Sequence, residues 1–243
     1  VEKLLLRGGF PLTILAKTTE AAKLWQQSFL TTYIERELPA LGLNVSPRLV
    51  QRLFQMLAHL HGSIINYSQL AGALGVTYHT VQNITDYLEN AFLIRRLQPW
   101  FSNSKKRIVK SPKIYIRDTG ILLNLLKIYS MKDLLGHPQC GMVWEGFVLE
   151  QCANYFGKKY DYYFYRTQDG SETDIVITKA GKPFAAIEAK INTAPVLTAG
   201  TYNAIKDLKT KNNYVITPRK ENGLIAIGKN LLTGNIETLL DKF

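Results

Sequence analysis

Hydrophobic and polar residues alternate along two neighbouring stretches in the second half of the chain, residues 171–178 and 184–191. Because side chains two positions apart on a strand share a face, this alternation predicts two strands joined by a turn at Gly181. One face of the resulting β-hairpin is apolar, with Ile175 and Ile187 among its members, and faces a core. The opposite face collects charged side chains: Glu172, Asp174, Glu188 and Lys190.

Further helices and strands are predicted on both sides of this hairpin. Hydrophobic periodicity indicates helices at 142–156, 198–209 and 236–243, and strands at 161–166, 214–217 and 224–227. The order helix, three-stranded meander, helix, strand is typical of an α/β layer built on a mixed sheet. The expected fold class is therefore α/β, or α+β overall, because the first half of the chain is mostly helical.

Helical periodicity dominates the first half of the chain. It predicts helices at 20–38, 46–62, 68–75 and 78–90. A short helix, a turn containing Gly75 and a second helix form the helix-turn-helix arrangement. Two predicted strands, at 92–97 and 114–117, then flank a loop rich in lysine, arginine and serine, which we interpret as a wing.

A winged helix of this kind would contact DNA through two sets of residues. Outward side chains of the second helix would enter the major groove, and basic side chains of the wing would neutralise phosphates. The helix residues are Tyr78, His79, Thr80, Gln82 and Asn83, and the wing residues are Lys105, Lys106, Arg107 and Lys110. Winged helices also serve as protein-contact modules, and the second helix has no lysine or arginine facing a groove, so both kinds of partner stay open.

The overall charge favours an anionic partner. The chain has 30 Lys and Arg against 19 Asp and Glu, a formal net charge of +11 and a pI near 9.5, which indicate nucleic acid as the partner. Cys140 and Cys152 form no Cys-x-x-Cys or Cys/His cluster, so we expect no zinc site and a reducing, cytoplasmic setting. No apolar run approaches the roughly 20 residues of a membrane span, so we expect a soluble protein with no membrane partner.

Carboxylates with a neighbouring lysine suit phosphodiester hydrolysis, which needs an activated water and a shield for developing negative charge. Asp174 and Glu188 would hold Mg²⁺ or Mn²⁺, since Mg²⁺ prefers one or two carboxylates with water and phosphate oxygens. Glu145, on the preceding helix, would add a direct or water-mediated ligand, and Lys190 would orient or activate the water. Glu172 is a reserve candidate. The alternatives are a solvent-facing ion pair, or a cluster that stabilises the sheet or binds DNA without cutting it.

On these residues, segment 142–217 resembles the PD-(D/E)XK nuclease superfamily. The helix glutamate of the superfamily corresponds to Glu145, its strand aspartate to Asp174, and its Glu-x-Lys to Glu188 and Lys190. Thr173 stands where the proline of the superfamily name would be, which is a common departure.

The whole chain is similar to the C-terminal half of a large prokaryotic group of AAA-type ATPases. The similarity rests on six motifs: Arg7-Gly8-Gly9-Phe10-Pro11, Leu-Ala-x-x-Leu-Gly-Val at 70–76, Ser-Pro-Lys-Ile-Tyr-Ile-Arg-Asp-Thr-Gly at 111–120, Trp144-Glu145, Glu172-Thr173-Asp174 and Ile187-Glu188-Ala189-Lys190. It implies an N-terminal ATPase domain followed by a winged helix and a nuclease-like domain. The chain contains no Gly-x-x-x-x-Gly-Lys-Ser/Thr phosphate loop, so we expect no ATP site within it.

We therefore predict three parts: a connecting segment from an absent ATPase domain at 1–20, a helical winged-helix domain at 21–118, and a nuclease-like domain at 119–243. The predicted function is metal-dependent DNA binding, with Mg²⁺ or Mn²⁺ as cofactor and phosphodiester hydrolysis as the activity of the nuclease-like domain. The alternative is a catalytically inactive module that docks the ATPase on DNA or on a protein. A transcriptional regulator would instead need sequence-specific affinity and usually a symmetric dimer.

Overall fold

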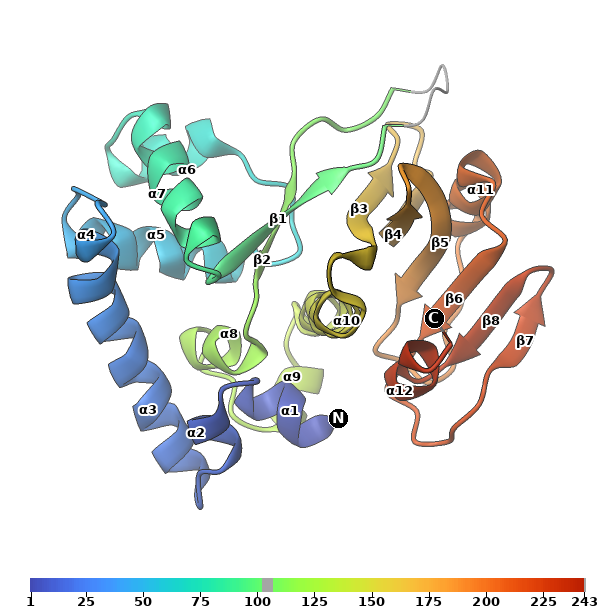
Figure 1. Ribbon diagram of the computed structural model, residues 1–243, viewed down its shortest axis with the longest axis horizontal. Coiled ribbons are helices and arrows are strands. Elements are labelled where there is room, and N and C mark those ends of the chain that lie inside the picture. Colours follow the sequence, from blue (N-terminus) through green and yellow to red (C-terminus); the bar gives the residue numbers. More distant parts are fainter. Residues whose placement is uncertain (102–106, 243) are drawn as a thin grey trace. The chain divides into compact units, whose positions relative to one another are not determined.

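The computed structural model describes residues 1–101 and 107–242. The chain folds into two compact units (Figure 1). Unit 1 comprises Val1–Arg96 and Ile114–Cys140, and unit 2 comprises Leu97–Lys113 and Gly141–Phe243. Each unit is therefore built from two separate stretches of the sequence.

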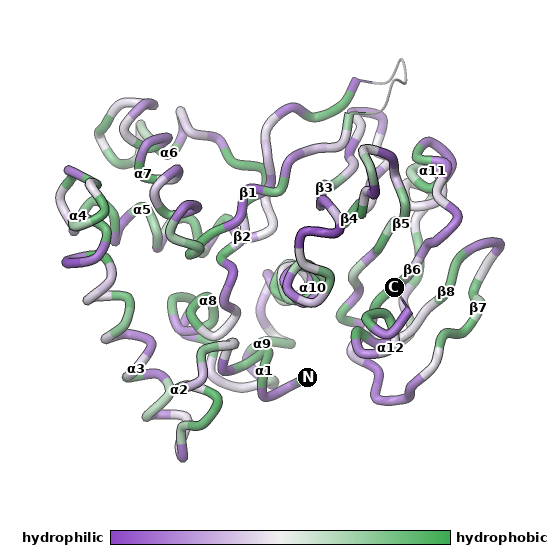
Figure 2. Tube along the Cα trace, viewed as in Figure 1, coloured by the Kyte–Doolittle hydropathy of each residue, from purple (hydrophilic) through white to green (hydrophobic). Residues whose placement is uncertain are grey.

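Unit 1 is mainly helical. Its helices are α1 (Glu2–Arg7), α2 (Pro11–Ile14), α3 (Thr19–Thr32), which continues through a π-helical segment (Tyr33–Glu37) into α4 (Leu38–Ala40), α5 (Pro47–His59), α6 (Tyr67–Leu74), α7 (Tyr78–Asn90), α8 (Thr119–Leu125) and α9 (Met131–Leu135). Hydrophilic and hydrophobic stretches alternate along α3, as Figure 2 shows. This pattern lets α3 bury Ala22, Gln26 and Leu30 against the rest of the unit.

Residues 1–20 belong to the packing of unit 1. α1 packs against α8, and α2 packs against α3. Asp118 joins these parts, because its Oδ2 accepts the Gly9 N–H at 2.7 Å and its Oδ1 accepts the Ile121 N–H at 2.8 Å. The second bond makes Asp118 the N-cap of α8. A Cβ atom at Gly8 would lie 2.1 Å from Asp118 Oδ1, so this approach requires glycine.

The predicted domain boundaries therefore differ from the division between the units. The segment 1–20 is not a separate connection, since its two short helices pack on α3 and α8. Residues 119–140, assigned above to the nuclease-like domain, also lie in unit 1, because α8 packs against α1, α3 and α5. Short helices with little periodicity of their own gave no signal of this packing.

Asp118 also makes the stability of unit 1 depend on pH. Burial raises the pKa of Asp118 above its ordinary value of 3.8, against the opposing effect of the N–H groups that it accepts. A carboxyl group whose pKa rises on folding holds its proton more tightly in the native state, so its contribution to stability falls as pH rises through the ordinary pKa toward the raised one. We expect the stability of the wild type relative to Asp118→Asn, measured by urea unfolding, to decline as the pH rises above the ordinary pKa of 3.8. A difference that grows with pH would mean that the N–H donors outweigh burial.

Helices α6 and α7 reproduce the two short helices predicted at 68–75 and 78–90. Gly75 ends α6 with a left-handed φ of 69°, a conformation that favours glycine. The Thr77 side chain accepts the Thr80 N–H and so caps α7. The inward positions of α7 are buried: Val81, Ile84 and Leu88.

The two strands predicted to flank a wing belong to a larger sheet. They are β1 (Ile94–Pro99) and β2 (Lys113–Ile116), and β1 pairs in parallel with β3 (Asp161–Arg166), with Gln98 opposite Tyr163. Ile108, in the predicted wing loop, forms an isolated bridge with Thr167. The wing prediction missed these contacts because the partner strand lies far along the chain.

Unit 2 carries most of an eight-stranded mixed sheet, which confirms the expected mixed α/β architecture. The strand order is β2-β1-β3-β4-β5-β6-β8-β7. The remaining elements are β4 (Glu172–Lys179), β5 (Lys182–Ala189), β6 (Asn212–Ile216), β7 (Ile225–Gly228), β8 (Leu231–Gly234), α10 (Cys140–Phe156), α11 (Ala199–Leu208) and α12 (Ile236–Leu240). β4 and β5 form the predicted antiparallel hairpin, with Ile175 opposite Ile187.

Helices α10 and α11 cover opposite faces of this sheet, on either side of β3–β5 in Figure 1. Val176 and Ala186 pack with Ala204 of α11 in one buried cluster. Tyr162 pairs with the residue that follows Val176, and the side chains of that pair point to the face of the sheet opposite Val176. On that face the Tyr162 hydroxyl donates to the Cys152 carbonyl of α10 at 3.0 Å. Both faces of the central strands are therefore covered. In the part of the chain that the structure describes, no helix combines the length and apolar character that a membrane crossing requires.

Candidate functional site

Three buried carboxylates come from three separate elements of unit 2. Glu145 lies on α10, Asp174 on β4 and Glu188 on β5, and these residues are 8%, 8% and 7% exposed. The pKa of Asp174 is raised well above its usual range by burial and then by the charges of Glu145 and Glu188, because the three groups lie close together. Lys190 follows β5, and its Nζ lies 2.7 Å from Glu188 Oε1. The structure thus brings the four predicted residues into one group.

The hairpin register explains how Asp174 and Glu188 meet. Ile175 stands opposite Ile187, so the next pair along the two strands brings Asp174 beside Glu188. The Ala189 N–H donates to Asp174 Oδ2 at 2.9 Å and fixes that carboxylate against β5. The geometry therefore follows from the alternation seen in the sequence.

A second lysine, Lys113, lies inside this group and was missed by the sequence reasoning. It is the first residue of β2 and is only 3% exposed. Its Nζ donates to Glu145 Oε1 at 2.9 Å and lies 3.5 Å from Glu172 Oε1 and 4.0 Å from Asp174 Oδ1. We call Glu145, Glu172, Asp174 and Glu188, together with Lys113 and Lys190, the acidic cluster.

A signal for Lys113 was present in the sequence. Lys113 heads the run Ile114-Tyr115-Ile116, whose residues are at most 1% exposed. A lysine on such a buried strand requires an anionic partner, since an unpaired buried charge is very costly. The wing interpretation made residues 114–117 a strand that flanks the DNA-contacting loop, so Lys113 fell in the loop and no buried anionic partner was sought for it.

Burial and mutual repulsion set the charges of the acidic cluster. Burial raises the pKa of Glu188, against the opposing effect of Lys190. For Lys113, burial lowers the pKa, but the charges of Glu145 and Asp174 outweigh burial and the net pKa is raised. For Lys190, burial likewise lowers the pKa, and the Glu188 carboxylate outweighs it. Both lysines are therefore cations at neutral pH, while the raised pKa values of Asp174 and Glu188 indicate a local shortage of positive charge.

One carboxylate oxygen of the acidic cluster lacks a partner. Glu188 Oε2 is buried and accepts no hydrogen bond from residues 1–101 or 107–242. Leaving such an oxygen unsatisfied costs roughly 1–3 kcal/mol, or more when it is charged. Mg²⁺ takes one or two carboxylates with water and phosphate oxygens, so Asp174 and Glu188 fit a divalent cation. A set of three His, Cys, Asp or Glu side chains arranged for a metal is absent from the described residues, and Glu145 is instead bonded to Lys113.

The residues predicted to contact DNA are divided between the two units. On α7 in unit 1, Tyr78, His79 and Asn83 are exposed, whereas Thr80 and Gln82 are partly buried. Tyr78 packs its ring edge-on against Tyr67 and His79. In unit 2, Arg107 and Lys110 are exposed, and the predicted contacts Lys105 and Lys106 lie outside the described residues.

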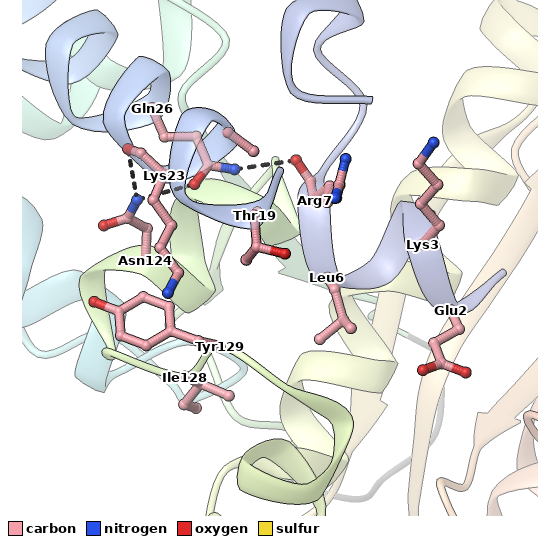
Figure 3. A pocket seen from close by; sticks show the side chains of 12 residues that line it. Glu2, Lys3, Leu6, Arg7, Thr19, Lys23, Gln26, Asn124, Ile128 and Tyr129 are labelled. Atoms are coloured by element: carbon pink, nitrogen blue, oxygen red, sulfur yellow. Dashed lines mark hydrogen bonds between the residues drawn. The ribbon is translucent and has the colours of Figure 1, made fainter. Parts of the chain in front are cut away.

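A cavity of about 430 Å³ in unit 1 is a weaker candidate site. It is bordered by α1, α3 and α8. Lys23 Nζ lies 3.4 Å from the centre of the Tyr129 ring, while Lys3 and Glu2 extend away from that ring in Figure 3. The amides that line it are bonded to the protein itself, because Gln26 Nε2 donates to the Arg7 carbonyl and Asn124 Nδ2 donates to Gln26 Oε1. Its charged groups do not converge, so we regard the acidic cluster as the candidate site.

Matches to known protein families divide the chain near the boundary between unit 1 and unit 2. Residues 1–132 match the family described as "Domain of unknown function (DUF8612)", and residues 140–232 match "Domain of unknown function (DUF4143)". The break between the two matches lies close to Cys140, where the chain leaves unit 1 for the last time.

Two curated mycobacterial proteins are similar to the chain. They are "Uncharacterized protein Rv2008c" of Mycobacterium tuberculosis and "Uncharacterized protein Mb2031c" of Mycobacterium bovis. Each is 35% identical over 246 residues, which cover 98% of this chain and 55% of the relative. The chain thus spans about half the length of the curated relatives it matches. No solved structure matches the chain significantly.

Proposed function

The chain belongs to the DUF8612 family, and from this premise we propose that its unit 2 is a nuclease-like domain that binds DNA and hydrolyses phosphodiester bonds with a divalent metal ion. The observation that carries the proposal is the unpartnered, buried Glu188 Oε2 beside Asp174. The resemblance of Glu145, Asp174 and Glu188-Ala189-Lys190 to the PD-(D/E)XK pattern supports it.

Asp174 and Glu188 would hold Mg²⁺ or Mn²⁺, and Glu145 would add negative charge nearby. When bound, the ion supplies a Lewis acid and makes water a stronger nucleophile at neutral pH. Because the pKa of Lys190 is raised, Lys190 stays protonated and would orient the water and shield the attacked phosphate, instead of acting as a base. In the reaction the water oxygen bonds to phosphorus and the water gives up a proton to solvent, while one P–O ester bond breaks and the departing oxygen takes up a proton from solvent.

The full-length protein would connect this nuclease-like unit to other parts. We propose that α6 and α7 with β1 and β2 act as a winged helix that contacts DNA, consistent with the exposed Tyr78, His79 and Asn83. DUF4143 is commonly found in proteins associated with AAA-type ATPases, and both curated relatives are longer than this chain. An ATPase domain of the same protein, in the cytoplasm, is therefore the partner that we propose for both units.

Plasmid nicking tests the proposed function. Metal-free protein is incubated with supercoiled plasmid in chelator, Mg²⁺ or Mn²⁺, and nicked circles are counted over time. We expect nicking only with metal, and a loss of at least about 10²-fold in Lys190→Met, because a group acting on the attacking water is removed. Lys182→Met, which changes an exposed lysine at the start of β5, keeps full activity as the matched control. Metal-independent nicking, or equal nicking by both variants, refutes the assignment.

Phosphate contacts by Arg107 and Lys110 are tested by salt dependence. Both residues are exposed in unit 2, and the proposal gives them contacts to the DNA backbone. Each lost phosphate contact reduces the slope of log affinity against log salt by about 1. Arg107→Ala and Lys110→Ala should each show this reduction in fluorescence anisotropy with duplex DNA, whereas Lys132→Ala, an exposed lysine on α9, should not. An unchanged slope in both variants would exclude these two contacts.

A second candidate function is favoured by Lys113. Its ammonium occupies the space between Glu145 and Glu172, where a cation would otherwise satisfy both carboxylates. On this reading the acidic cluster only stabilises the fold, and the chain is an inactive module that docks the ATPase on DNA or a protein. Salt-dependent DNA binding without any metal binding or nicking would support this second function over the first.

A further inference from the structure

Lys113 and a divalent ion compete for the same part of the acidic cluster. Lys113 Nζ lies 2.9 Å from Glu145 Oε1 and 4.0 Å from Asp174 Oδ1, so it stands between these two carboxylates. An ion held by both of them would need oxygen ligands at about 2.0–2.1 Å for Mg²⁺, and would sit almost on top of the ammonium. Two like charges at such a separation in a buried site repel strongly. Lys113 and a metal ion therefore cannot share the Glu145 side.

The surroundings of Lys113 hold it in this position. Lys113 is 3% exposed, and Ile114 after it is fixed by backbone hydrogen bonds to Ser63 and Gly62. The ammonium also lies 5.5 Å from the centre of the Phe164 ring, on an inner strand of the sheet. Withdrawal into solvent would uncover these packed groups and leave Glu145 buried without its cation.

The Glu188 side of the acidic cluster has no comparable internal cation. The Lys190 ammonium lies 2.7 Å from Oε1 of Glu188, and the Lys190 side chain is 36% exposed. Oε2 of the same carboxylate is the buried oxygen without a partner in the described residues. Asp174 presents Oδ2 toward β5, where it accepts the Ala189 N–H. The two sides of the cluster are thus unequal, one neutralised by Lys113 and the other short of positive charge.

We propose that Lys113 is the built-in cation of the Glu145 side, so that the acidic cluster takes one divalent ion, held by Asp174 and Glu188, and Glu145 is not its ligand. This inference rests on the proposed function only in requiring that the cluster bind a divalent ion. Replacing the ammonium by an uncharged side chain would open a second ion position among Glu145, Glu172 and Asp174. Lys113 is therefore a positioning residue that fixes how many ions the site holds.

Manganese binding tests this inference without using activity. Chelator-treated full-chain protein is titrated with Mn²⁺, and free Mn²⁺ is followed by electron paramagnetic resonance. We expect one bound ion in the wild type, two in Lys113→Met, and one in the matched control Lys182→Met. Glu145→Gln leaves the Lys113 strand intact and should still bind one ion. Mutating a group that supports a metal ligand lowers metal affinity by roughly tenfold or more, and we expect a smaller loss in Glu145→Gln.

The outcomes separate the inference from the proposed function. If Lys113→Met still binds one ion, or if Glu145→Gln loses tenfold or more in affinity, the role given to Lys113 is wrong even when the wild type nicks DNA with metal. If the wild type binds one ion and follows the predicted pattern but nicks nothing, the inference holds and hydrolysis is refuted. Should Lys113→Met fail to fold, the Glu145→Gln titration alone decides between ligand and non-ligand. If neither the wild type nor Lys113→Met binds Mn²⁺, both proposals fall.

Discussion

Asp174→Asn is expected to abolish both Mn²⁺ binding and metal-dependent nicking. Asparagine keeps the acceptor for the Ala189 N–H but removes the charge that, with Glu188, would hold the ion. Losing the ion forfeits several kcal/mol of transition-state stabilisation, which at about 1.4 kcal/mol per tenfold lowers the nicking rate on the order of 10³-fold or more. The nicking assay with supercoiled plasmid measures this loss directly.

The same substitution should raise stability. Asp174 is buried next to two other carboxylates, so in metal-free buffer a neutral amide removes repulsion from Glu145 and Glu188. We expect Asp174→Asn to melt above the wild type without metal, which is typical of residues whose charge serves function at the expense of stability. Asp161→Asn is the matched control, because Asp161 is an exposed strand aspartate and should change neither property. Full nicking by Asp174→Asn would exclude this carboxylate from the reaction.

Lys113→Met should destabilise the metal-free protein by roughly 3–5 kcal/mol, since removing one member of a buried ion pair leaves the other charge uncompensated. Lys113 Nζ donates a hydrogen bond to the buried Glu145 carboxylate, and methionine has a similar length without the charge. Urea unfolding of the chelator-treated variants measures the difference. Lys182→Met, at an exposed position, should stay within about 0.5 kcal/mol of the wild type.

The stability of Lys113→Met can also be measured with added metal. If Mn²⁺ enters the space left by Lys113, saturating it at 100 times its dissociation constant should restore about 2.7 kcal/mol to Lys113→Met. A loss below about 1 kcal/mol in metal-free buffer would instead mean that the ammonium contributes no more than an exposed ion pair does.

Much of the acidic cluster could be predicted from the sequence. Alternation along 171–178 and 184–191 fixes which side chains of the hairpin share a face, so Asp174 and Glu188 could be paired without knowledge of the fold. Glu145 required more, because alternation says nothing about a helix position: its place on the preceding helix suggested it, and the resemblance to the nuclease superfamily supported it. Neither the alternation nor the resemblance pointed to Lys113, because Lys113 lies on β2, which is an edge strand of the sheet.

Long-range pairing limited the prediction of the fold in the same way. Helices α3, α5, α6 and α7 and the strands β3 to β6 follow from local periodicity, and their predicted positions agree with the structure to within a few residues. The strand β8 (Leu231–Gly234) was missed, because four residues ending in glycine carry too little alternation to be recognised, and its parallel partner β6 supplies the pairing. Residues 1–20 were missed for a related reason, since α1 and α2 gain their stability from packing on α8 and α3 rather than from their own sequence.

Anomalous scattering from crystals grown with Mn²⁺ tests the central claim most directly. The account predicts a single manganese peak bonded to Asp174 and Glu188, with Lys113 still hydrogen-bonded to Glu145. A Mn²⁺-saturated crystal with no peak at Asp174 and Glu188, or with manganese bonded to Glu145 in the position of the Lys113 ammonium, would contradict it.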